Sequence, residues 1–213
     1  MASSLSLEDV NYYYISSEDM EMSVSEQVSI ALDCGVKMIQ YRNKNGTSRE
    51  MYRDALKLKK LCLERALFIV NDRVDIALAV EADGVHLGQE DLPGEIARCL
   101  IGDMILGIST HDLGQAEEAS KIADYIGIGP VHKTATKKNA DEALGVQGIL
   151  DIARTVDVPT AAIGGVREAD ISQLAQEVDM LCAISGVCCD ERFTERVKHF
   201  EKHFHEEKRR LKP

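Results

Sequence analysis

The chain has 213 residues, 45% of them hydrophobic, so it can bury a substantial core in one compact domain near the lower size limit of a barrel enzyme. Its formal net charge of −11 argues against a general nucleic-acid binder and against a protein that binds an anionic membrane surface. Any anionic ligand must therefore be held by a local cluster of basic side chains.

Targeting signals and cysteine usage indicate where the chain works. No stretch of eighteen or more apolar residues occurs, and Met1–Glu8 lacks the basic and then apolar pattern of a secretory signal. The six cysteines are scattered without a Cys-x-x-Cys pair, which is typical of reduced core thiols. We therefore expect a soluble cytoplasmic protein without a membrane partner. The sequence leaves open whether the chain forms a homo-oligomer.

Short apolar runs alternate with longer amphipathic segments from one end of the chain to the other. Such alternation indicates βα units, and strands that are apolar throughout are typical of parallel sheets buried on both faces. The expected strands are Tyr12–Ile15, Met38–Tyr41, Leu67–Val70, Gly84–Leu87, Ile105–Ile108, Tyr125–Ile128, Thr160–Ile163 and Met180–Ile184. The expected helices are Ser25–Cys34, Ser48–Glu64, Arg73–Val80, Glu95–Leu100, Leu113–Ile122, Gln147–Thr155, Glu168–Glu177 and Glu191–Glu206.

Eight strands and eight helices predict an α/β protein, a closed (β/α)8 TIM barrel that forms one domain over residues 1–213. We expect an N-terminal extension over roughly residues 1–10 and a polar C-terminal tail over roughly 205–213. An open, doubly wound sheet is the alternative. It is disfavoured because the sequence has neither a Gly-x-Gly-x-x-Gly motif nor a P-loop. In a barrel, chemistry takes place where the strands end, so the strand ends carry the functional prediction.

Basic residues follow the second expected strand. Alternation along the strand places Gln40, Arg42 and Lys44 on one side. A guanidinium offers a planar fork of donors and an ammonium offers a compact charge, a combination suited to a diphosphate. A solvated turn after the strand is the competing interpretation.

Carboxylates follow the third and fourth expected strands. Asn71 and Asp72 come directly after one strand, and Asp91 comes shortly after the next. Mg²⁺ prefers oxygen ligands and is often held by one or two carboxylates together with substrate phosphates, so Asp72 and Asp91 are candidate ligands. The competing interpretation is that these residues cap helices or lie in solvated turns.

The remaining strand ends carry hydroxyl groups, lysines and glycines. Ser109 lies at the end of the fifth strand, and the polar loop after the sixth contains Thr134, Thr136 and Lys137, as an anion-binding lid would require; an exposed loop is the alternative. Gly165 follows the seventh strand, and Ile184 and Ser185 follow the eighth. In barrels these two loops often bind phosphate, although tight turns alone would also explain the glycines.

Taken in order, these segments resemble the thiamine phosphate synthase family. The matching segments are Gln-Tyr-Arg-Asn-Lys from Gln40, Asn-Asp-Arg from Asn71, Gly-Val-His-Leu-Gly-Gln-Glu-Asp-Leu-Pro from Gly84, Gly-Ile-Ser-Thr-His from Gly107, Thr-Ala-Thr-Lys from Thr134 and Ala-Ile-Gly-Gly from Ala162. The resemblance extends from about Tyr12 to Phe200. Departures are His132-Lys133, where an aromatic-proline pair is usual, and the bulkier Asp179-Met180-Leu181-Cys182.

The resemblance implies a transferase that joins 4-amino-2-methyl-5-hydroxymethylpyrimidine diphosphate to a thiazole carrying an ethyl phosphate, or to the carboxylated form of that thiazole. It implies Mg²⁺ as cofactor and diphosphate as second product. It implies catalytic roles for Arg42, Lys44 and Lys137. The implied contacts to the pyrimidine diphosphate are Gln40, Arg42, Lys44, Asn71, Ser109 and Lys137. The implied metal ligands are Asp72 and Asp91, and the implied thiazole phosphate contacts are Thr134, Thr136, Gly165, Ile184 and Ser185.

Two other functions remain as alternatives, a thiazole tautomerase of the same barrel type and a non-catalytic sensor of thiamine phosphates. A tautomerase would need neither the pyrimidine-diphosphate residues nor the metal pair. We expect His86 and His111 to be a strand residue and a cap rather than catalytic groups. His199 and His203 could face together on the last helix, but their charged neighbours are typical of a solvated tail, and we assign them no metal.

Overall fold

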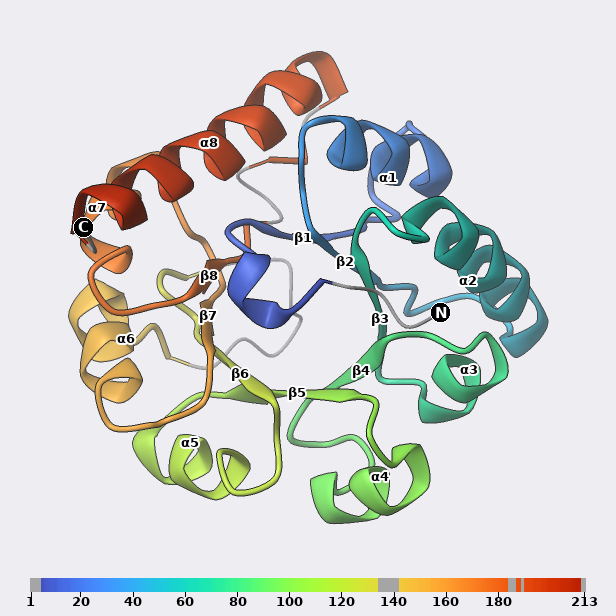
Figure 1. The fold of residues 1–213 in the computed structure, drawn as a ribbon, viewed down its shortest axis with the longest axis horizontal. Helices are drawn as coiled ribbons and strands as arrows, with labels where there is room; N and C mark the ends of the chain where they lie inside the picture. The colour runs from blue at the N-terminus through green and yellow to red at the C-terminus, as the bar shows by residue number, and fades with distance from the viewer. Residues whose placement is uncertain (1–4, 134–141, 184–186, 189, 212–213) are drawn as a thin grey trace.

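A computed structural model of the chain describes residues 5–133, 142–183, 187–188 and 190–211. Eight parallel strands pair in chain order from β1 to β8 (Figure 1). A parallel bridge between Tyr12 and Leu181 joins the last strand to the first and closes the ring. The strands are β1 (Tyr13–Ile15), β2 (Met38–Tyr41), β3 (Leu67–Asn71), β4 (Gly84–Leu87), β5 (Ile105–Thr110), β6 (Tyr125–Ile128), β7 (Thr160–Ala162) and β8 (Met180–Leu181). The predicted single-domain TIM barrel is confirmed.

Helices surround the strands, as Figure 1 shows. They are α1 (Val24–Asp33), α2 (Ser48–Cys62), α3 (Val74–Ala79), α4 (Gly94–Ile101), α5 (Leu113–Ala119), α6 (Gly145–Ala153), α7 (Ile171–Leu174) and α8 (Phe193–Leu211). In the described part of the chain, short 3-10 helices accompany them: η1 (Leu7–Asp9), η2 (Glu168–Asp170) and η3 (Asp190–Arg192). The seventh expected helix is therefore split, because η2 precedes a single turn of α7.

Local sequence determines where the first two long helices begin. Ser23 precedes α1 and accepts a hydrogen bond from the backbone N–H of Glu26, whose carboxylate bonds back to Ser23. Thr47 and Glu50 make the same reciprocal pair before α2. Such capping boxes satisfy backbone donors that a helix start leaves free, and each cap contributes about 1 kcal/mol.

Alternation along the strands divides the core into two layers. One set of side chains fills the barrel, so its interior is a packed core: Val10, Tyr13, Ile15, Met38, Leu67, Ile69, Tyr125, Ala161, Met180 and Cys182. The other set packs outward against the helices. Residues in register with the inner set at the ends of strands therefore face the mouth of the barrel.

The N-terminal segment closes the opposite end. Leu5 and Leu7 pack against the interior cluster, and Figure 1 shows η1 lying over the centre of the strand ring. The expected N-terminal extension thus covers the amino-terminal face of the barrel. This leaves the carboxyl ends of the strands as the face available for chemistry.

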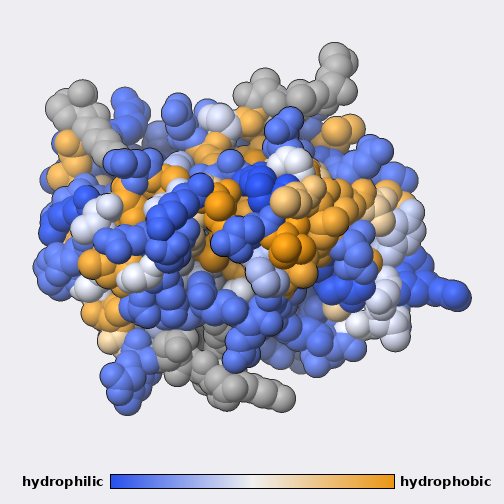
Figure 2. Space-filling model, turned by 90° about the horizontal axis from the view of Figure 1, so that it is seen from below, coloured by the Kyte–Doolittle hydropathy of each residue, from blue (hydrophilic) through white to orange (hydrophobic). Residues whose placement is uncertain are grey.

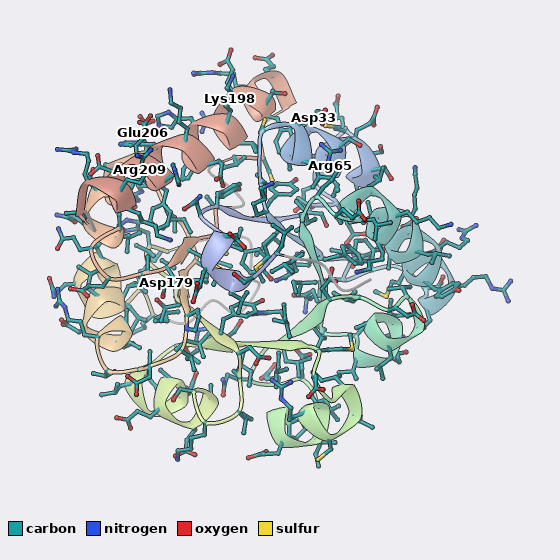
Figure 3. The ribbon with its side chains drawn as sticks, in the orientation of Figure 1. Asp33, Arg65, Asp179, Lys198, Glu206 and Arg209 are labelled. Carbon is teal, nitrogen blue, oxygen red and sulfur yellow. The ribbon has the colours of Figure 1, made fainter. Side chains whose placement is uncertain are left out.

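The expected polar tail is helical over residues 205–211, because α8 continues to Leu211. Phe204 is fully buried, and Lys208 lies over its ring and donates a hydrogen bond to the carbonyl oxygen of Asp179 at 2.7 Å. These contacts hold the last turns of α8 against the barrel just before β8, while Glu206 and Arg209 on the same turns are exposed (Figure 3).

On the face shown in Figure 2, hydrophilic residues are interspersed with apolar areas, one of which lies over α4. Ile96 and Leu100 of that helix are 51% and 56% exposed. Elsewhere exposed ion pairs join neighbouring elements, as between Asp33 and Arg65 (Figure 3). Among the described residues, none of the helices is both long enough and apolar enough to cross a bilayer.

Candidate active site

The loop after β2 is tied to the loop after β1. The backbone N–H of Arg42 donates to the hydroxyl of Ser16 at 3.0 Å, and that of Lys44 donates to the carboxylate of Glu18 at 3.0 Å. Gln40 is buried inside the barrel at 2% exposure. The expected convergence of these three residues holds in part: Gln40 lies inside the mouth, whereas Lys44 lies at its rim.

Two carboxylates and one ammonium group meet where β3 and β4 end. The side chain of Lys44 forms an ion pair with the carboxylate of Asp72, which is 18% exposed. Asp72 has a left-handed backbone (φ 62°), which aspartate adopts more readily than most residues, and its N–H donates to the carbonyl of His86 at 2.8 Å. The carboxylate of Asp91 accepts from the N–H of Gly88 at 2.7 Å. The turns after the two strands therefore fix both aspartates.

The pair of carboxylates is a donor set suited to a divalent cation. Burial and the neighbouring carboxylate of Asp72 raise the pKa of Asp91 above its usual value, although the Gly88 N–H and the charge of Lys44 oppose the shift. A bound cation would relieve the repulsion that Asp72 exerts on the ionised carboxylate of Asp91, and Mg²⁺ prefers such hard oxygen donors. The residues present thus fit the ion that the resemblance implies.

The raised pKa of Asp91 predicts a pH-dependent cost to folding. Because the folded-state pKa exceeds the unfolded value, stability from this group is present below about pH 4 and is lost as pH rises through the folded pKa. In a chelator, Asp91→Asn should therefore raise the melting temperature at pH 7 and change it little below about pH 4. Thermal unfolding across this range measures the effect.

Saturating Mg²⁺ should reverse the order of the two melting temperatures at pH 7, so that the wild type melts above Asp91→Asn, because the ion binds the wild-type carboxylate. Glu90→Gln changes an exposed neighbour and serves as the control. If Asp91→Asn raises the melting temperature by the same amount in Mg²⁺ as in chelator, the carboxylate pair does not bind the ion.

A buried chain of hydrogen bonds crosses the barrel below the mouth. The amide nitrogen of Gln40 donates to the hydroxyl of Tyr13 at 2.5 Å, and this hydroxyl lies 2.7 Å from that of Tyr125. The Tyr125 hydroxyl is 2.9 Å from Nδ1 of His86, and Nε2 of His86 is 2.9 Å from the hydroxyl of Ser109. These hydrogen bonds link two predicted substrate contacts, Gln40 and Ser109, that come from opposite parts of the strand ring.

Sequence reasoning missed the two tyrosines of this buried hydrogen-bond chain, Tyr13 and Tyr125. His86 is the buried strand residue that we expected, but both of its ring nitrogens are engaged and one of them orients Ser109. A neutral imidazole donates with one nitrogen and accepts with the other, so the neighbours fix its orientation. Tyr13 and Tyr125 lie at inward-facing positions of their strands. The one sequence signal for their role is that each places a phenolic hydroxyl, which needs a hydrogen-bond partner, inside an apolar barrel.

Glycines shape the opposite side of the mouth, after β7. Gly164 and Gly165 have left-handed backbones (φ 87° and 69°), and a Cβ on Gly165 would lie 2.9 Å from the carbonyl oxygen of His132. The N–H of His132 donates to the carbonyl of Gly164 at 2.9 Å, and its imidazole contacts the buried carboxylate of Asp170 at 3.0 Å. The unusual His132 is thus held in place by a partner on η2.

The other predicted residues divide into two groups. Asn71 ends β3 in register with His86, on the inward-facing side of the strand. Thr134, Thr136, Lys137, Ile184 and Ser185 lie outside the described residues. The structure therefore brings together Gln40, Lys44, Asp72, Asp91 and Ser109, and it places Gly165 beside the loop that leads to Thr134.

Comparison with known proteins identifies the family. A sequence model described as thiamine monophosphate synthase matches residues 12–187. The chain belongs to the thiamine monophosphate synthase family. A relative named thiamine-phosphate synthase from Methanosarcina barkeri is 40% identical over 198 residues, which cover 91% of this chain and 90% of the relative. A second, from Archaeoglobus fulgidus, is 39% identical over 184 residues, covering 85% and 87%.

Solved structures agree with this assignment. The thiamine phosphate pyrophosphorylase from Pyrococcus furiosus superposes with a TM-score of 0.87 at 36% identity, covering 94% of this chain and 98% of that one. The resemblance predicted from the sequence is confirmed. The thiamine monophosphate synthase match includes all eight strands and the rim residues described above, whereas α8 lies beyond its last residue.

Proposed function

We propose that this chain is a transferase that joins a pyrimidine diphosphate, 4-amino-2-methyl-5-hydroxymethylpyrimidine diphosphate, to a thiazole bearing an ethyl phosphate. The products are thiamine phosphate and diphosphate. The observation that carries the proposal is the cluster of Lys44, Asp72 and Asp91 at the carboxyl ends of β2–β4. It combines an ammonium group with a carboxylate pair that would hold a divalent cation, and these are the two sources of positive charge that a diphosphate needs on an acidic protein.

Asp72 and Asp91 are the residues that would hold Mg²⁺. When bound, the ion would supply positive charge to the oxygens of the diphosphate. Lys44 pairs with Asp72 and extends from the same rim at 49% exposure, so its ammonium can also reach a phosphate that shares the site. Arg42 follows β2 two residues earlier, and its guanidinium is suited to two phosphate oxygens at once.

The chemistry requires no nucleophilic side chain. The bond between the methylene carbon and the diphosphate oxygen breaks, and its electron pair leaves with the diphosphate. The pyrimidine-methyl cation left behind is captured by the lone pair of the thiazole nitrogen, which forms the new C–N bond. Cationic groups that stabilise the departing charge accelerate this step, and we assign that role to Arg42, Lys44 and Lys137.

Substrate positioning is the second contribution of the chain. We assign Gln40, Asn71 and Ser109 to the pyrimidine, since they lie inside or beside the mouth and two of them belong to one hydrogen-bond chain. We assign the thiazole phosphate to Gly165 together with Thr134, Thr136, Ile184 and Ser185. Holding two reactants in contact can lower a barrier by roughly 7–11 kcal/mol.

A tautomerase is disfavoured because it would need no carboxylate pair, and a sensor would bind products without turnover. The deciding experiment supplies both purified substrates to the wild-type protein, with and without Mg²⁺, and measures thiamine phosphate and diphosphate. We expect both products in equal amounts and only with the metal. Absence of product under conditions in which a known synthase is active would overturn the proposal.

A further inference from the structure

A second cluster of metal-ligating side chains lies away from the proposed active site. Glu168 of η2 and His199 and His203 of α8 each offer one ligand atom, and the three atoms lie within 4.8 Å of one another. Figure 1 shows α7 and α8 on the opposite side of the strand ring from α3 and α4. Asp72 lies in the loop just before α3, and Asp91 lies in the loop just before α4. The two clusters are therefore separate.

Packing fixes the two histidines on one face of α8. They are four residues apart, so they lie one above the other on the helix surface. Phe200 and Phe204, the residue after each histidine, are buried at 4% and 0% exposure and set the rotation of the helix. The two imidazole rings lie side by side, with centroids 5.2 Å apart. The helix thus presents the pair toward η2.

The third group comes from a different element. Nε2 of His199 is 3.0 Å from a carboxylate oxygen of Glu168. Zinc bonds of about 2.0–2.1 Å to nitrogen and oxygen place tetrahedral ligand atoms about 3.3 Å apart. The observed separations therefore need only small side-chain rotations to enclose an ion. We propose that Glu168, His199 and His203 bind one Zn²⁺ ion that clamps α8 to η2.

The chemistry of the ligands selects the metal. Two imidazoles and one carboxylate suit a borderline-soft ion such as Zn²⁺, whereas Mg²⁺ prefers oxygen alone. Nδ1 of His203 is buried and has no hydrogen-bond partner in the described part of the chain, so one ring nitrogen there is unsatisfied. Glu207 lies 4.0 Å from Nε2 of His203 and brings a second carboxylate close to the cluster.

An ordinary surface ion pair is the competing explanation. His199 and Glu168 are 43% and 69% exposed, and exposed pairs contribute little to stability. That explanation accounts for the contact between Glu168 and His199. It also accounts for the 4.0 Å approach of His203 to Glu207. It does not account for the convergence of ligand atoms from Glu168, His199 and His203 within 4.8 Å of one another.

Zinc titration of the metal-stripped protein tests the proposal. A chromogenic chelator competes for Zn²⁺ in the presence of a thiol reductant and excess Mg²⁺, which occupies the aspartate pair. We expect one zinc ion per chain with micromolar affinity, and a melting temperature raised by about 5 °C or more at a hundredfold excess over the dissociation constant. The readout is binding, so it does not depend on the proposed transferase activity.

Two variants make the result specific. His199→Ala/His203→Ala should weaken zinc binding at least about thirtyfold and abolish the thermal shift, because two of three ligands are lost. His205→Ala removes an exposed histidine from the same helix and should bind zinc like the wild type. Equal melting temperatures of all proteins in chelator show that folding is intact. Wild type without zinc binding, or a double variant that binds equally well, would overturn the proposal.

Discussion

The Asp72→Asn variant is expected to form thiamine phosphate about 10²- to 10³-fold more slowly than the wild type, the usual loss when one group that stabilises developing charge is removed. Asparagine keeps the shape of the side chain and tolerates the left-handed backbone at this position. The substitution therefore removes charge without disturbing the turn after β3. Initial rates over a range of Mg²⁺ concentrations should also show half-saturation at a higher concentration.

Two control variants separate metal binding from other effects at this rim. Asp75→Asn changes an aspartate three residues away that is 64% exposed and paired with Arg73, so it should leave the rate nearly unchanged. Lys44→Gln should lower the rate while moving half-saturation to a lower Mg²⁺ concentration, because the ammonium that pairs with Asp72 no longer competes with the ion. If Asp72→Asn kept both the wild-type rate and the wild-type Mg²⁺ response, the assignment of the metal ligands would be wrong.

The barrel was predictable from the sequence because each strand is a short apolar run between amphipathic segments. The starts of seven strands agree with the expectation, and β1 begins one residue later, at Tyr13 rather than Tyr12. Ends were harder to place, as at β5, where Ser109 and Thr110 continue the strand. A polar residue at the end of a strand is indistinguishable from the first residue of a loop until the pairing is known. The long α8 was underestimated for a similar reason, since the anchoring role of Lys208 depends on Asp179.

The site was predictable only where its residues follow strand ends. Asp72 and Asp91 are recognisable because parallel strands bring their carboxyl ends to one rim. Tyr13 and Tyr125 are 112 residues apart in sequence, and nothing local to either one predicts that their hydroxyl groups meet. The cluster of Glu168 with His199 and His203 has the same origin, because the spacing of the histidines is visible whereas their approach to η2 is a result of folding.

The Tyr125→Phe variant should weaken use of the pyrimidine diphosphate by removing a single oxygen from the barrel interior. The Tyr125 hydroxyl contacts both Tyr13 and His86. Its loss therefore interrupts the hydrogen bonds that connect Gln40 with Ser109 and leaves buried polar groups without a partner. Burial raises the pKa of Tyr125 well above its usual value, so the phenol is neutral at every pH at which the protein is assayed. We expect a stability loss of about 1–3 kcal/mol.

Substrate kinetics distinguish a positioning role for Tyr125 from a structural one. The KM for the pyrimidine diphosphate should rise about tenfold, the equivalent of about 1.4 kcal/mol, while the KM for the thiazole phosphate stays near its wild-type value. Tyr41→Phe is the matched control, because that hydroxyl contacts Asn43 and, at 3.4 Å, Asp54, outside the buried hydrogen-bond chain, and its ring packs in the outer layer. Equal changes in both KM values, or a loss of stability with unchanged kinetics, would show that the buried chain supports the barrel without orienting a substrate.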